Sequence, residues 1–447
     1  MLQHIADKFG RLLTPSTMYA LYKHTPRSVL NSVSRAQFRR TVTWAGQRSS
    51  FYREAFAQRG IRAADVRTPA DLGDFFTTPE DVAHRAEEFI CRPANIVFES
   101  SGTTGKNKRI YYTKDELEGM GSVEAVGMRL MGVRPHDRIA NGFDFSIWIP
   151  GMLCHYGLMA AGNFCLAFGK VDPVEVYRRL NQYNFTVVIG EPTWLIRLTE
   201  LAERDGGGTL RMLIGGAEEM PADAIPWMEK VWNGASIRMC YGSVEQGSAL
   251  GFQPCRNFDG YHVDDSSFMP EIVDPDENGY GELVFTTLFR RTMPLIRYRT
   301  RDVTRFIPGP CPCGSGSPRI EKLRGRRDEL VVASGGNLYP LMFEGILGPI
   351  AGLTHDFQIV FRLAGVREIM EIHVETTRSD PETLMSEIKA SATQQYPDLM
   401  KNLALGIFEM RLVMHAPETI RGGRKIKRMI DLRYATENPV EAVPVSG

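Results

Sequence analysis

The chain is long, charge-balanced and ordinary in composition, and these properties exclude several classes of protein. Its 447 residues exceed what one hydrophobic core usually serves, so we expect one large and one smaller domain. Lys plus Arg and Asp plus Glu each number 53, a balance that argues against nucleic acid as a partner. The chain start lacks a signal-peptide pattern, and no stretch approaches the ~18 apolar residues of a membrane span. Seven unevenly placed cysteines are too few for a disulfide scaffold, which predicts a reducing, cytoplasmic setting.

The spacing of apolar residues predicts a change of architecture along the chain. Residues 1 to about 90 mix charged and apolar positions at helical spacing. From residue 95 onward, short apolar strands alternate with helical segments, and this order predicts a buried, largely parallel sheet. The clearest elements are strands at 95–99, 185–189 and 210–214, and a helix over 193–202.

The C-terminal third changes pattern twice. Residues 282–306 are rich in strand formers, with 283–287 the clearest strand, and a Gly/Pro/Cys-rich break follows at 308–318. After Asp328 the predicted elements are strands near 358–362, 369–376 and 408–414, and a helix from 381 to about 395. We therefore predict a large α/β domain with mostly parallel sheets at 1–327 and a smaller α+β domain at 328–447.

A loop rich in glycine and hydroxyl groups directly follows the first predicted strand. It reads Ser100, Ser101, Gly102, Thr103, Thr104, Gly105, Lys106, Asn107 and Lys108. Glycines let a backbone approach a ligand closely, hydroxyls donate hydrogen bonds, and lysines neutralise phosphate charge. It is not a Walker loop, because only two residues separate its glycines and Lys106 is followed by Asn107. The alternative is a polar hairpin loop without a ligand.

Four motifs in order resemble those of a known enzyme family. The loop is followed by Tyr241-Gly242-Ser243-Val244-Glu245, by Arg297-Tyr298-Arg299-Thr300-Arg301-Asp302 and by Gly325-Arg326-Arg327-Asp328. Together they resemble the adenylate-forming acyl- and aryl-CoA synthetases, and the phenylacetate-CoA ligase branch looks most similar. The resemblance spans roughly residues 95 to 431, and Asn107 stands where proline is more common in the family.

The resemblance implies roles for each motif. Residues 100–106 would bind the ATP phosphates, with Thr104 among the catalytic groups. Tyr241 and Gly242 would flank the adenine, and Glu245 would act in catalysis and help to hold Mg²⁺, a hard cation that bridges phosphates.

The third and fourth motifs would complete the nucleotide site. The resemblance implies that Asp302 accepts from the ribose hydroxyls, that Arg326 lies near the ribose, and that Asp328 is the hinge between the domains. On the residues alone, Asp302 could instead join a surface ion pair with Arg299, Arg301 and Arg305, and Glu245 could be a solvated loop carboxylate.

A glycine-introduced basic run, Arg421 to Arg428, lies near the C-terminus. By itself it indicates a solvated loop, or a patch that faces RNA or membrane. The family carries a lysine three residues before an arginine here, which corresponds to Lys425 and would bridge the attacking carboxylate and the α-phosphate. Arg424 stands where glycine is usual, so Lys427 remains the weaker alternative. Rotation of the small domain about Asp328 would deliver Lys425 for adenylation and withdraw it afterwards.

Cysteine and histidine residues suggest a structural metal site. Cys311 and Cys313 lie on a tight turn, and Cys255 and His262 flank a turn-rich stretch upstream. A Cys₃His set suits tetrahedral Zn²⁺, and the resemblance implies a metal held by such residues, as in some relatives of the branch. The site would fix the 308–318 loop to the large domain. The alternative is free cysteines with an ordinary surface histidine.

The family resemblance places the acid pocket between the phosphate loop and Tyr241. The candidates are Phe143, Phe145, Trp148 and the turn Gly215-Gly216-Ala217-Glu218. Aromatic walls suit a flat, apolar acid, although an aromatic residue taken singly is more often part of the core. Asp144 and Glu218 are candidates for contact with a polar substituent.

The predicted function is ATP-dependent activation of a carboxylic acid, expected to be aromatic, followed by transfer to coenzyme A. The predicted cofactors are ATP, Mg²⁺, coenzyme A and a structural Zn²⁺. An alternative acceptor is the thiol of an acyl carrier protein, or an amine. A protein of another class, a nucleotide-binding relative without ligase activity, is disfavoured because Lys425, Glu245 and Asp302 are all present.

Overall fold

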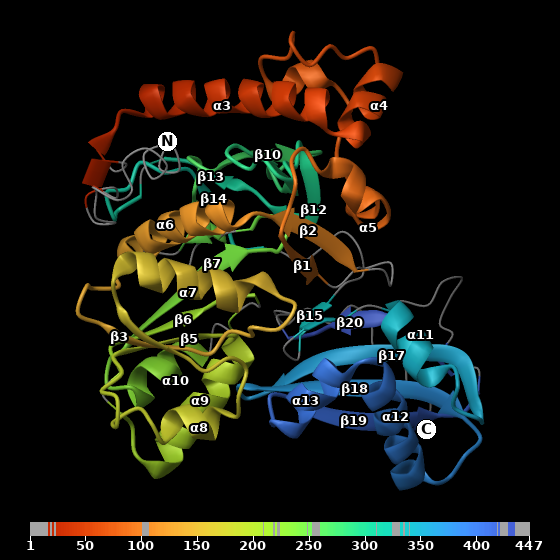
Figure 1. The fold of residues 1–447 in the computed structure, drawn as a ribbon. Helices are drawn as coiled ribbons and strands as arrows, with labels where there is room; N and C mark the ends of the chain where they lie inside the picture. The colour runs from red at the N-terminus through yellow and green to blue at the C-terminus, as the bar shows by residue number, and fades with distance from the viewer. Residues whose placement is uncertain are drawn as a thin grey trace.

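The computed structural model consists of a large α/β part and a smaller α+β part (Figure 1). It describes residues 24–100, 107–208, 210–217, 224–247, 249–252, 260–309, 311–323, 331–333, 336–338, 340–417 and 428–433, with residues 17, 20, 21, 220, 419 and 420. The predicted fold class is confirmed. Among the described helices, none has both the length and the apolar character needed to cross a bilayer.

Helices dominate the described residues before 90, as predicted. They are α3 (Arg27–Arg48), α4 (Ser50–Gln58), η1 (Pro69–Leu72), α5 (Pro79–Arg85) and η2 (Ala86–Phe89). The Ser49 hydroxyl caps α4 by accepting from the Tyr52 amide at 3.2 Å. The long helix α3 lies across the end of the molecule opposite the small part (Figure 1). It packs Phe38, Val42 and Ala45 into the main core.

A nine-stranded sheet forms the centre of the large part, in the order β13-β14-β9-β8-β7-β6-β5-β3-β4. Five adjacent strands are parallel: β4 (Phe164–Ala167), β3 (Arg138–Asn141), β5 (Val187–Gly190), β6 (Met212–Gly215) and β7 (Ser236–Gly242). Every residue of β5 and β6 is buried, which explains their uninterrupted apolar runs. The predicted strands at 185–189 and 210–214 are thereby confirmed.

Helices cover the parallel half of this sheet. They are α6 (Lys114–Leu130), α7 (Ile149–Ala161), α8 (Pro173–Tyr177), α9 (Pro192–Asp205) and α10 (Ala224–Val231). The predicted helix at 193–202 corresponds to α9. Beyond β7 the sheet continues antiparallel through β8 (Ala249–Phe252), β9 (Gly260–Val263), β14 (Arg319–Glu321) and β13 (Phe306–Ile307). Parallel pairing therefore stops at β7, because the described residues between β7 and β8 contain no helix that could make a parallel crossover.

Two further antiparallel units flank the main sheet. The strand predicted at 95–99 is β1 (Ile96–Ser100), which pairs with β2 (Lys108–Tyr112) in a hairpin outside the main sheet. The connection between them is too short for a parallel crossover. The strand predicted at 283–287 is β11 (Gly281–Thr287), which lies between β10 (Phe268–Val273) and β12 (Tyr298–Thr304).

The small part has its own hydrophobic core, which includes Phe343, Phe361 and Ile372. Its sheet has the order β19-β18-β17-β20, with β17 (Leu353–Ala364), β18 (Arg367–Thr376), β19 (Glu409–His415) and β20 (Met429–Asp431). The remaining elements are β15 (Val331–Ala333), β16 (Gly336–Leu338), α11 (Pro340–Leu347), α12 (Pro381–Gln395) and α13 (Pro397–Ala404). The predicted strands and the predicted 381–395 helix are confirmed, whereas the boundary at Asp328 lies outside the described residues.

The small part contacts the large part along α9. Ile407 is buried within the main core of the large part, and Arg367 lies 3.4 Å from the Glu200 carboxylate. These contacts place the turn between β17 and β18 against the helix that follows β5.

Candidate active site

A buried carboxylate lies at the base of the glycine- and hydroxyl-rich loop. Glu245 follows β7 and is only 4% exposed. Its Oε1 atom lies 2.5 Å from the Lys108 ammonium and accepts hydrogen bonds from the Ser100 hydroxyl at 3.3 Å and the Tyr298 hydroxyl at 3.0 Å. Ser100 and Lys108 are cross-strand partners at the end of the β1–β2 hairpin that joins the loop. The structure thus brings the loop, the Glu245 motif and the Tyr298 motif together.

Charge pairing keeps this buried carboxylate ionised. Burial alone would raise the pKa of Glu245, but the Lys108 ammonium, with the hydrogen bonds that Glu245 accepts, lowers it to about 2. Lys108 is itself only 5% exposed, so solvent screens the pair weakly. Glu245 is therefore ionised at neutral pH, as one half of an ion pair with Lys108.

The backbone beside Glu245 is held from two sides. The Tyr112 hydroxyl donates to the Val244 carbonyl at 2.6 Å, and the Arg290 guanidinium donates to the Glu245 and Gln246 carbonyls. Arg290 also stacks over the Tyr112 ring at 4.7 Å. These contacts fix the segment that carries the carboxylate against β2.

A second pair of predicted residues meets at the end of β7. The Tyr241 hydroxyl donates to Asp302 Oδ2 at 2.5 Å, which places the proposed adenine and ribose groups side by side. Asp302 is buried, while Tyr241 is half-buried and Gly242 is exposed. The arginines around Asp302 form other ion pairs: Arg299 with Glu282, Arg301 with Glu80, and Arg305 with Glu321.

The candidate acid-pocket residues follow the carboxyl ends of β3 and β6. A Cβ atom on Gly216 would lie 3.2 Å from the Phe143 ring and 2.8 Å from the Cys240 sulfur, so these three residues are in close contact. Ala217 has a φ of 73°, a conformation that costs energy for a residue other than glycine. Gly215 ends β6. In parallel sheets this edge is where ligands bind.

The other two aromatic candidates make contacts of their own. The half-buried Phe145 packs edge-on against His155 with 6.0 Å between ring centroids. Trp148 is the N-cap residue of α7 and packs against the main core. The Asp144 carboxylate accepts from the amide and hydroxyl of Ser146.

Several predicted residues lie outside the described part of the chain. They are Ser101, Gly102, Thr103, Thr104, Gly105, Lys106, Glu218, Cys255, Arg326, Asp328, Lys425 and Lys427. Their predicted roles stay predictions.

Two family models match the chain. The family model of AMP-binding enzymes matches residues 54–282, just over half of the chain, and the model of the AMP-binding enzyme C-terminal domain matches residues 335–433. The chain belongs to the AMP-binding enzyme family. The first match includes Ser100, Glu245 and the β1–β2 hairpin, whereas Asp302 and Tyr298 lie beyond it.

Individual relatives of this AMP-binding enzyme are similar over nearly its whole length. It is 26% identical to the phenylacetate-coenzyme A ligase of Escherichia coli over 427 residues, covering 90% of this chain and 95% of that protein. It is 27% identical to the phenylacetate-coenzyme A ligase of Thermus thermophilus, covering 91% and 98% of the two chains. The fold is also similar to a crystal structure of 2-hydroxyisobutyryl-CoA ligase, with a TM-score of 0.77 and 20% identity over 93% of this chain and 92% of that one.

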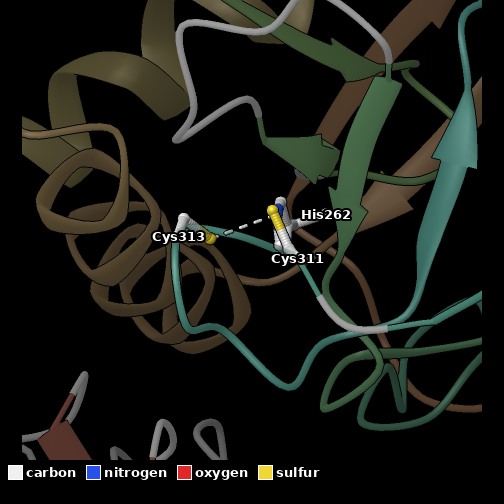
Figure 2. A group of neighbouring side chains, drawn as sticks. All are labelled: His262, Cys311 and Cys313. Carbon is white, nitrogen blue, oxygen red and sulfur yellow. Dashed lines mark hydrogen bonds between the residues drawn. The ribbon is translucent and has the colours of Figure 1, made fainter.

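A cluster of metal-ligating side chains lies at the antiparallel end of the main sheet. His262 on β9 meets Cys311 and Cys313 from the loop between β13 and β14, and Figure 2 shows the three side chains converging. Their ligand atoms all lie within 4.8 Å of one another, and His262 Nε2 is 3.5 Å from Cys313 Sγ. Tetrahedral Zn²⁺ bonds of about 2.3 Å to sulfur and 2.0 Å to nitrogen imply a separation of about 3.5 Å. The three residues therefore fit a zinc site.

Three residues of the site were not assigned a role from the sequence. Lys108 was regarded only as part of the phosphate loop, and neither Tyr298 nor Arg290 was identified as a partner of Glu245. The alternation of β2 carries a signal for Lys108: residues 108, 110 and 112 are all buried on one face. A lysine at a buried strand position indicates a buried acidic partner.

Proposed function

We propose that this AMP-binding enzyme activates a carboxylic acid with ATP and transfers the acyl group to coenzyme A. The observation that carries the proposal is the convergence of Ser100, Lys108, Glu245 and Tyr298 at the base of the loop, beside the Tyr241–Asp302 pair. Two relatives named phenylacetate-coenzyme A ligases support the same reaction class.

The proposed reaction has two steps. A carboxylate oxygen attacks the α-phosphorus of ATP, the bond to pyrophosphate breaks, and an acyl-adenylate forms. The thiolate sulfur of coenzyme A then attacks the acyl carbon, and AMP leaves with the electron pair of the broken C–O bond. Both steps join negatively charged reactants, so positioning and cations placed near the phosphates supply the catalysis.

Each group has a role in this scheme. Residues 100–106, including Thr104, would bind the ATP phosphates, and the Tyr241 ring and Gly242 would flank the adenine. Asp302 would accept from the ribose hydroxyls and Arg326 would lie near them. Mg²⁺ would neutralise phosphate charge, and Glu245 suits it because its carboxylate is ionised. Ser100, Lys108 and Tyr298 all contact Oε1 of Glu245 and would hold the carboxylate in position for this role.

We further propose that the acid is aromatic. The contact between Phe143 and Gly216 at the carboxyl edge of the sheet provides a flat, apolar wall, with Gly215 and Ala217 next to it. Phe145 and Trp148 would border the same region. We also propose a cytoplasmic location for the protein, because a free thiol acceptor needs a reducing compartment.

Acid-dependent pyrophosphate release tests the proposal directly. We expect release with at least one member of a panel of aromatic and aliphatic acids, coupled one-to-one to coenzyme A consumption. The Lys425→Ala variant should lose pyrophosphate release by at least about a hundredfold, since a cation at the developing charge is worth several kcal/mol. It should still make thioester from synthetic acyl-adenylate.

Three outcomes contradict parts of this scheme. No release with any acid would contradict the ligase function, and release without thioester formation would contradict the choice of coenzyme A. Equal loss of both half-reactions would contradict the role of Lys425. Lys427→Ala is the matched control, which should keep both activities because Lys427 is the weaker candidate.

We also propose that His262, Cys311 and Cys313, with Cys255 as fourth ligand, hold a structural Zn²⁺. Purified protein should contain about one equivalent of zinc, and a Cys311→Ser/Cys313→Ser variant should lose it. The melting temperature of this variant should also fall, because the 308–318 loop would no longer be fixed to β9. Cys165→Ser, a half-buried cysteine elsewhere in the large part, is the control and should keep its zinc. Wild-type zinc well below one equivalent would contradict the site.

A further inference from the structure

A basic depression lies beside α3. Figure 1 shows that α3 crosses the end of the molecule away from the small part. Its cavity volume is about 590 Å³, and its charged lining consists of Arg39, Arg40, Arg67 and Arg291, with Trp44 between them. We call these five residues the arginine groove. None of them belongs to the candidate active site, so the groove is a separate feature of the large part.

The groove is assembled from three separate segments of the chain. Arg39, Arg40 and Trp44 come from α3, Arg67 from the loop before η1, and Arg291 from the loop between β11 and β12. The Trp44 indole donates to the Arg291 carbonyl at 2.9 Å, which fixes the third segment against α3. Over its 22 residues α3 contains no aspartate or glutamate. The fold therefore brings these arginines together from three segments, and α3 supplies no carboxylate that could pair with them.

The positive charge of the groove is not neutralised by the carboxylates around it. Among the described residues, no carboxylate forms an ion pair with any of these four guanidinium groups. Two carboxylates interact with the groove arginines electrostatically without such a pair, Asp71 with Arg67 and Glu116 with Arg291. Asp71 accepts from the Arg67 and Thr68 amides, and Glu116 accepts from the Arg291 and Thr292 amides. Burial lowers the pKa of Arg291, and the charge of Arg40 lowers it further.

We propose that the arginine groove binds a small polyanion that carries two or more phosphate groups. Guanidinium groups pair with phosphate oxygens through two parallel hydrogen bonds, and several guanidinium groups around one hollow suit more than one phosphate. The volume is in the range of small-molecule sites. Both inorganic polyphosphate and the phosphates of a nucleotide have this chemistry. A nucleotide could also place its base against Trp44.

Calorimetric titration with inorganic tripolyphosphate tests this proposal on the full chain. An Arg40→Ala/Arg67→Ala variant should bind tripolyphosphate at least tenfold more weakly than the wild type, because charge-assisted hydrogen bonds to two phosphates are lost. The matched control is Arg35→Ala/Arg62→Ala, which removes the same charge from exposed positions outside the groove. The control should change the dissociation constant less than twofold.

A parallel titration with CTP distinguishes the two sources of phosphate. Tighter groove-dependent binding of CTP than of tripolyphosphate assigns the site to nucleotides through Trp44. Equal or weaker binding of CTP shows that the groove recognises the phosphate chain without a contribution from the base. The proposal is overturned if both double variants weaken binding equally, since that is a general effect of charge. It is also overturned if the groove variant binds both probes like the wild type, or if the wild type binds neither.

Discussion

Replacing Lys108 by methionine should lower the free energy of unfolding by about 3–5 kcal/mol, because it leaves the Glu245 charge buried and unpaired. The pair is 2.5 Å apart and nearly inaccessible to solvent. In the wild type the pKa of Glu245 is lowered below its ordinary value, so the pair stabilises the fold above about pH 4.5, and that contribution is lost as the pH falls through the lowered pKa. Urea unfolding at pH 8 measures the effect.

The activity of the same variant should depend on pH in a new way. Without the Lys108 ammonium, burial dominates and raises the pKa of Glu245, so the carboxylate protonates as the pH falls towards 5.5. Pyrophosphate release at pH 5.5, relative to that at pH 8, should therefore fall several-fold in Lys108→Met and stay nearly constant in the wild type. Arg109→Met is the control, because its ion pair with Glu87 is exposed and should contribute less than about 1 kcal/mol. Equal effects of the two substitutions would contradict the role of the buried pair.

A second large effect is expected at Glu124, which is buried on α6 between α7 and the main sheet. Its Oε1 atom accepts from the Ala249 amide at 2.6 Å, and burial raises its pKa to about 7. Because the pKa of Glu124 is higher in the folded chain than in the unfolded chain, protonation of Glu124 stabilises the folded state. This stabilisation is lost as the pH rises from about 4.5 to 7. The difference of about 2.5 pKa units corresponds to about 3 kcal/mol.

The Glu124→Gln variant removes this titration while it keeps an oxygen for the Ala249 amide. The difference in unfolding free energy between the variant and the wild type should therefore shift by about 3 kcal/mol in favour of the variant between pH 4.5 and pH 8. Denaturant unfolding at several pH values measures this shift. Glu118→Gln on the exposed face of the same helix should show no such trend. A difference that stays constant with pH would show that Glu124 does not titrate in this range.

The sequence predicted most of the fold because local patterns determine most of its elements. The apolar runs of β5 and β6 and the helical spacing of α9 are properties of single segments. The sheet to which β1 belongs could not be predicted, because the sequence of an apolar strand does not indicate which strand it will pair with. The parallel arrangement likewise stops at β7, where the chain turns back into β8.

The same distinction applies to the candidate site: a local motif identifies some of its residues, and only the fold brings the others to it. Glu245 and Asp302 could be found because each lies in a recognisable motif. The partners Lys108, Tyr298 and Arg290 come from positions that only the folded chain brings together, so their roles were missed. The zinc prediction placed His262 with Cys311 and Cys313, and the structure brings these three together. Cys255 lies outside the described residues.

The three donors around Glu245 have a consequence for how the protein is assembled. Ser100 and Lys108 come from the hairpin, Tyr298 comes from β12, and Glu245 itself follows the last parallel strand. A charged carboxylate in the interior is stabilised by all of these partners, and the loss of any one is unfavourable. The site is therefore complete only when the hairpin, β12 and the end of β7 have come together in the folded chain. An incompletely folded chain would lack this positioned carboxylate, so we expect the proposed metal binding at Glu245 to be acquired together with completion of the large part.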